Sequence, residues 1–158
     1  MTTAETQNVG PKEVIYLLNK CIEVCIDSEK GYAVAAADVR DRVFKAAFLD
    51  KAQARSEFVV ELQRTIAQIG ALPENHGTAA GTVHRGWMGF RQAMEGRSDR
   101  LILEECARGE QQALAAYQHA VARTPLKSLP PEVSALLNNQ IAAIELDLQQ
   151  LRQQLNVH

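Results

Sequence analysis

The chain has 158 residues, of which 46% are hydrophobic and 23% charged, enough for one globular domain that buries a core without disulfides. Its formal net charge of -2 argues against a general attraction to nucleic acid or to an anionic membrane, because both need a positive surface. No stretch approaches the about 20 apolar residues of a membrane span, and the polar residues 1–10 do not resemble a signal peptide. We therefore expect a cytoplasmic protein with a flexible segment over 1–10 and a single domain over 11–156.

Two helices are predicted in the first half of the chain, because apolar residues recur three and four positions apart. The first begins at Pro11, which suits a first helical position, and extends to about Tyr32 or slightly beyond. Gly31 could loosen or end this helix, whereas the alanines after Tyr32 could continue it. The second helix covers about 38–69 and is stopped by Gly70.

Two further helices are predicted in the second half, over about 99–123 and about 131–155. Ser98 is the expected N-cap of the third helix, and a short turn over 124–130 makes the third and fourth helices antiparallel neighbours. The second and third helices are separated by the much longer segment 70–97. Two hairpins joined by one long crossover predict an all-α, ferritin-like four-helix bundle.

A short extra helix is predicted within the crossover, over 82–94. This segment holds the only tryptophan of the chain, Trp87, together with His84 and Arg85. These three residues could form a docking surface or a small anion site. Alternatively, Trp87 and Phe90 pin the crossover helix onto the bundle, and His84 supplies a hydrogen bond at its edge.

Many ferritin-like bundles hold a di-iron centre, so this is the first kind of site to look for. Such a centre requires a Glu-x-x-His motif on each of two helices. None of the four histidines has a glutamate three positions before it: His76, His84, His119 and His158. We therefore expect no metal cofactor. The alternative is an iron or manganese site built from carboxylates alone, for which the candidates are Glu29, Glu57, Glu61 and Glu110.

Charged residues nevertheless fall on the predicted helix seams, which are the stripes of core positions along which the helices pack against one another. Glu29 and Glu110 lie at core positions of the first and third helices, and Arg55 lies on the seam of the second. Since a lone buried carboxylate is costly, we expect Arg55 to bridge Glu29 and Glu110 in an ion-paired core layer, where a ferritin would hold metal. The other interpretation is that the helices rotate and bring these groups to a solvated rim.

The three cysteines, Cys21, Cys25 and Cys106, are an odd number and fit reduced thiols in a cytoplasm. Cys21 and Cys25 lie one helical turn apart and could contribute to a metal site, but no Cys-x-x-Cys or Cys/His pair completes one. We interpret them as small core residues.

Several sequence elements together resemble a bacterial family of ferritin-like four-helix-bundle proteins that is classed as a domain of unknown function. The resemblance covers about 14–151 and rests most specifically on His84-Arg85-Gly86-Trp87 and on Arg108-Gly109-Glu110. It implies a ferritin-like fold and a bacterial cytoplasm, without an established activity. Members often carry a histidine late in the last helix, and the matching stretch 144–148 has none. The other elements that carry the resemblance are Leu18-Asn19, Ile22-Glu23, Gly31-Tyr32, Ala35 to Val39, the stretch 55–62, Gly81 and Glu104-Glu105.

These observations favour a non-catalytic interaction protein, stress-associated in role and self-associating as a dimer. No serine lies in a Gly-x-Ser-x-Gly elbow, and the chain has no phosphate loop and no dinucleotide fingerprint. A metal-binding oxidoreductase or iron-handling protein is the first alternative. A small-ligand carrier that uses the bundle interior is the second.

Overall fold

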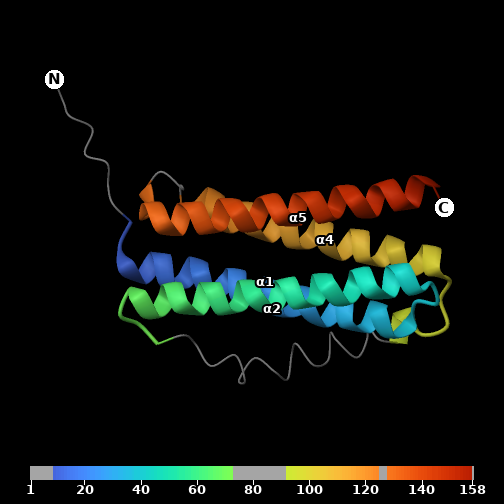
Figure 1. Cartoon of the computed structure of the whole chain (residues 1–158). Helices are drawn as coiled ribbons and strands as arrows, with labels where there is room; N and C mark the ends of the chain where they lie inside the picture. Colours follow the sequence, from blue (N-terminus) through green and yellow to red (C-terminus); the bar gives the residue numbers. More distant parts are fainter. Residues whose placement is uncertain (1–8, 73–91, 125–127, 158) are drawn as a thin grey trace.

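The computed structural model describes residues 9–72, 92–124 and 128–157, and these contain four long helices (Figure 1). They are α1 (Pro11–Asp38), α2 (Arg42–Gln68), α4 (Asp99–Arg123) and α5 (Pro131–Val157). The described residues contain no strand, so the all-α bundle predicted from the sequence is confirmed. None of the described helices combines the length and the apolar character that a bilayer span requires.

The helices form two hairpins, α1–α2 and α4–α5, and α1 also packs against α4 (Figure 1). Tyr32 of α1 contacts Glu110 of α4, and Cys25 contacts Tyr117, so these two helices run antiparallel. Arg55 of α2 contacts Asp147 of α5, and Phe58, three residues later on α2, contacts Gln140, seven residues earlier on α5, so α2 and α5 are antiparallel as well. Each helix therefore has antiparallel neighbours.

Helix α1 is longer than its glycine suggests. Gly31 lies inside the helix, which continues to Asp38. A glycine within a helix lowers its stability, and the burial of Tyr32, Ala35 and Ala36 in the core offsets this loss. The predicted start of the second helix at Asp38 is wrong, because residues 39–41 form the turn and α2 begins at Arg42.

Other helix ends agree with their sequence signals. Pro11 occupies the first turn of α1, and the hydroxyl of Ser98 accepts a hydrogen bond from the backbone N–H of Leu101. Gly70 follows the end of α2 with φ of 89°, a left-handed conformation that favours glycine. The short helix predicted within 82–94 falls mostly outside the described residues.

The apolar core consists of two clusters. One surrounds Leu18, Leu62 and Leu137 near the start of α1, and the other surrounds Phe48, Ile102 and Leu151 near its end. Polar side chains lie where the two clusters meet.

The turn between α1 and α2 is held by Asp99 at the start of α4. The two oxygens of its carboxylate accept hydrogen bonds from the backbone N–H groups of Arg40 and Asp41, both at 2.9 Å. Asp41 in turn caps α2, since its side chain accepts from Val43 and Phe44. One carboxylate therefore joins the two hairpins at this end of the bundle.

Replacing Asp99 with alanine is expected to lower the free energy of unfolding by about 1–3 kcal/mol, because two backbone donors lose a charged acceptor. Chemical denaturation followed by circular dichroism measures the change. Asp50→Ala, an exposed position on α2, is the matched control and should change stability by less than about 0.5 kcal/mol. Equal effects of the two substitutions would contradict a role of Asp99 in joining the hairpins.

Candidate functional site

The centre of the bundle holds a polar layer to which all four helices contribute. Arg55 of α2 donates from Nη2 to Oε1 of Glu110 on α4 and, at 2.7 Å, to Oδ2 of Asp147 on α5. Tyr32 of α1 donates its phenol proton to Oε2 of Glu110. We call these four residues, together with Lys51, the Arg55 layer.

Lys51 completes the charge balance of the Arg55 layer. Its Nζ lies 2.9 Å from Oδ1 of Asp147, so the layer contains two cations and two carboxylates. The side chains of Arg55 and Glu110 are each 1% exposed, whereas those of Lys51 and Asp147 are 14% and 17% exposed. The layer thus extends from the centre of the bundle to its α2–α5 edge and carries no net charge.

Part of the Arg55 guanidinium faces an aromatic ring. Its Nε and Nη1 are buried without a hydrogen-bond partner among the described residues, and its central carbon lies 5.1 Å from the ring centroid of Phe58. The negative face of an aromatic ring attracts a cation and offsets part of the missing hydrogen bonds. The side chain of Arg55 is therefore held at the centre of the bundle by two carboxylates and one aromatic ring.

The protonation states within the layer follow from burial and pairing. Burial raises the pKa of Glu110, while the guanidinium of Arg55 and the hydroxyl of Tyr32 oppose this rise. Burial alone would lower the pKa of Arg55, but Glu110 and Asp147 raise it above its ordinary value. Burial also raises the pKa of Tyr32, so its phenol remains the proton donor to Glu110.

A second polar layer lies seven residues along α1, α4 and α5. Tyr117 donates to Oε1 of Gln140 at 2.7 Å, and because a phenol has one proton, the thiol of Cys25 donates to Tyr117 at 3.0 Å. The amide nitrogen of Gln140 then donates to the carbonyl of Phe58 and to Glu61. Burial raises the pKa of Cys25 to about 11, so this thiol is protonated at neutral pH.

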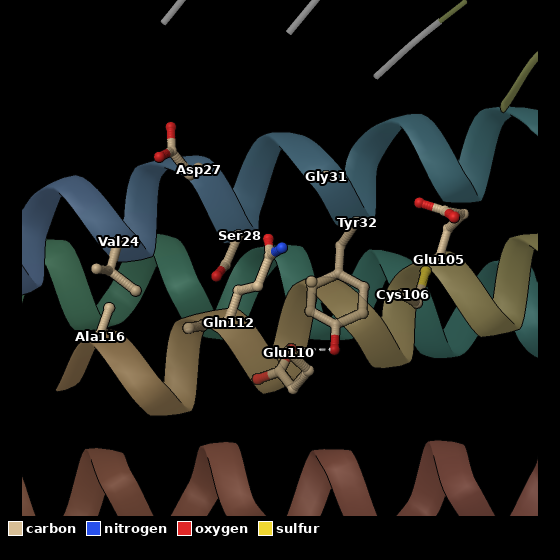
Figure 2. Close-up of a pocket in the computed structure, with 12 residues that line it drawn as sticks. Val24, Asp27, Ser28, Gly31, Tyr32, Glu105, Cys106, Glu110, Gln112 and Ala116 are labelled. Carbon is tan, nitrogen blue, oxygen red and sulfur yellow. Dashed lines mark hydrogen bonds between the residues drawn. The ribbon is translucent and has the colours of Figure 1, made fainter. Parts of the chain in front are cut away.

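A groove runs along the outside of the bundle between α1 and α4. One section, of about 290 Å³, has Tyr32, Cys106 and Glu110 among its lining residues, and Figure 2 shows Tyr32 pointing to Glu110 there. The other section, of about 740 Å³, lies between the start of α1 and the end of α4. The two sections meet at Val24 and Ala116, which line both.

Comparison with known families identifies the chain. A family model described as "Domain of unknown function (DUF2383)" matches residues 13–123. The chain belongs to this family. The match includes Tyr32, Arg55 and Glu110, whereas Asp147 and Gln140 lie beyond it. No curated protein matches the chain.

The prediction that Glu29 belongs to the core layer of this DUF2383 chain is wrong. The structure brings Arg55 and Glu110 together, but the second carboxylate at Arg55 is Asp147 and not Glu29. Glu29 lies half-buried on α1, and Tyr32, three residues further on, takes the core position beside Glu110. A neutral phenol enters the core at a lower desolvation cost than a carboxylate does.

The carboxylates proposed as an alternative metal site do not converge. Glu110 is buried and paired with Arg55, while Glu57 and Glu61 are exposed on α2 and Glu29 is half-buried on α1. Within the described residues, no group of three or more His, Cys, Asp or Glu side chains is placed to hold a metal ion. The predicted crossover site of His84, Arg85 and Trp87 lies outside the described residues.

Sequence reasoning missed the second polar layer completely. Tyr117 falls on the apolar seam of α4, and Gln140 lies beside the aliphatic seam of α5, so apolar spacing marks neither residue as part of a polar layer. A signal was present in the spacing, since Gln140 and Asp147 are one heptad apart, as are Tyr117 and Glu110. Polar residues that repeat at heptad spacing on two helices indicate successive layers of one bundle core.

Proposed function

We propose that this protein is a non-catalytic interaction protein of the bacterial cytoplasm, built on a ferritin-like bundle and self-associating as a dimer. The observation that carries the non-catalytic part is the Arg55 layer. In ferritin-like di-iron proteins the inward-facing carboxylates hold metal, whereas here Glu110 and Asp147 are neutralised by Arg55 and Lys51. In this proposal the guanidinium of Arg55, and not a metal ion, supplies the positive charge that these carboxylates need.

The state of the buried thiols supports the same proposal. Burial raises the pKa of Cys25 to about 11 and that of Cys106 to about 12, so neither is a thiolate nucleophile at neutral pH. The helix directions also support a ferritin-like arrangement, because two antiparallel hairpins are joined by the long segment between α2 and α4.

Self-association is supported by apolar side chains on the bundle surface. Leu49 and Val60 of α2 and Leu146 of α5 are all exposed. Burying such side chains between two copies would remove apolar surface from water, at about 25 cal/mol per Å². Both helices lie away from the α1–α4 groove, so a dimer through α2 and α5 would leave that groove accessible.

Light scattering after size-exclusion chromatography, combined with metal analysis of the purified protein, tests the proposal. We expect a species of twice the 17.4 kDa chain mass, and a shift toward monomer in Leu49→Glu and Leu146→Glu. Glu145→Gln, an exposed α5 position, is the control. Stoichiometric iron or manganese that is lost in Glu110→Gln would overturn the non-catalytic proposal, and a monomer at all concentrations would overturn self-association.

A small-ligand carrier is the second candidate function. The observation that favours it is the α1–α4 groove, whose larger section has a volume of about 740 Å³. Binding sites for small molecules commonly have volumes of about 300–1,000 Å³. The bundle interior itself is filled by the two apolar clusters and the polar layers, so the groove is the place for a ligand.

A further inference from the structure

The larger section of the α1–α4 groove has an apolar floor. Leu17 and Tyr117 are buried beneath it, and Val24, Ala116 and Ala120 extend the apolar surface toward the middle of the groove. Small side chains on α4 leave this space open, because alanine adds only one methyl group. A hydrocarbon chain laid along this floor would exchange water contacts for apolar ones.

An aromatic side chain borders the same section. Tyr16 of α1 is 60% exposed, although a large apolar ring is usually better covered. The Nζ of Lys20 lies 5.5 Å from the centroid of its ring, which keeps a positive charge at this border. Tyr16 thus offers an uncovered aromatic surface beside a cation.

The charged residues around the groove are unevenly distributed. Lys12, Lys20 and Arg123 line the larger section together with His119, against two glutamates, of which Glu23 is paired with Lys20 at 3.3 Å. The lining of the smaller section includes no Lys, Arg or His, and of its three acidic members Glu105 is paired with Arg108 and Glu110 with Arg55, which leaves Asp27. The cations that line the groove therefore lie toward the start of α1, and none lines the section near Tyr32.

We propose that the larger section binds a small amphipathic anion, with its acidic head at Arg123 and Lys12 and its hydrocarbon tail along the floor toward Val24. The inference rests on the carrier function proposed above and names its ligand class. A guanidinium suits a carboxylate head because it offers parallel N–H donors. The smaller section offers a negative head no cation, so the cations of the larger section set the direction in which the ligand lies.

Three probes with the same tail and different heads test this inference by isothermal titration calorimetry, each below its micellar concentration. They are decanoate, decyltrimethylammonium and decyl maltoside, which are negative, positive and uncharged. We expect decanoate to bind at least about tenfold more tightly than the other two. Its affinity should fall as the salt concentration rises, because Arg123 and Lys12 are exposed.

Variants locate the site. Arg123→Glu should weaken decanoate binding by about tenfold or more, because it replaces an attraction with a repulsion. Arg64→Glu makes the same charge change at an exposed α2 position and should leave the affinity within about twofold. Far-ultraviolet circular dichroism of both variants confirms that the helices remain folded.

The outcomes separate the ligand class from the carrier function. If decyltrimethylammonium or decyl maltoside binds as tightly as decanoate, the groove takes ligands but the anionic class is wrong. If none of the three probes binds, both the inference and the carrier function of this groove are overturned. Equal losses in Arg123→Glu and Arg64→Glu would show that decanoate binds elsewhere on the protein.

Discussion

Replacing Arg55 with methionine is expected to lower the free energy of unfolding by about 3–5 kcal/mol at pH 7. Methionine fills most of the volume of the arginine side chain but supplies no charge. Glu110, whose side chain is 1% exposed, would then lie in the core with only the phenol of Tyr32 beside it. Asp147 would lose one partner and keep Lys51. Urea denaturation followed by circular dichroism measures the loss.

A second variant distinguishes the buried charge from lost packing. Arg55→Met combined with Glu110→Gln removes the unpaired carboxylate and should be more stable than Arg55→Met alone, because no charge remains buried without a partner. Arg64→Met, an exposed position on the same helix, is the control and should stay within about 0.5 kcal/mol of the parent. A loss below about 1 kcal/mol in Arg55→Met would show that the Arg55 layer does not stabilise the core.

The pairing of Arg55 with Glu110 could be predicted from the sequence because both residues fall on helix seams. A charge that the hydrophobic spacing places in the core needs an opposite charge there, and only a few residues were available. The α1 partner was harder to predict, since Glu29 and Tyr32 are three residues apart and both suit a heptad position. Which of them faces inward depends on the rotation of α1 against α4, which spacing within one helix does not determine.

Asp147 was missed for a different reason. The seam of α5 is aliphatic, with Ile144 and Leu148 on either side of this aspartate, so apolar spacing gives no indication that Asp147 takes part in the core. It reaches Arg55 because it lies toward α2, at the edge of the bundle, where its side chain is still 17% exposed. Such an edge contact depends on which helices are neighbours across the bundle, and the pattern of one helix carries no information about this.

Alkaline conditions are expected to destabilise the bundle through its buried thiols. Burial raises the pKa of Cys25 from 9.0 to about 11 and that of Cys106 to about 12, and burial also raises the pKa of Cys21. The folded state therefore holds these protons at a pH where the unfolded chain has lost them. The stabilisation is complete below pH 9 and is lost as the pH rises through the pKa values of the folded state.

At pH 10, one unit above the ordinary thiol value, each buried cysteine accounts for a loss of roughly 1 kcal/mol. The three cysteines together should lower the free energy of unfolding by about 3–4 kcal/mol between pH 7.5 and pH 10, measured by urea denaturation. In a variant with all three replaced by alanine, the difference between the two pH values should shrink by that amount. All other ionisable side chains are the same in both proteins, so the comparison isolates the thiols. If the parent and the cysteine-free variant lose equal stability, the thiols ionise freely in the folded state and are not buried as the structure places them.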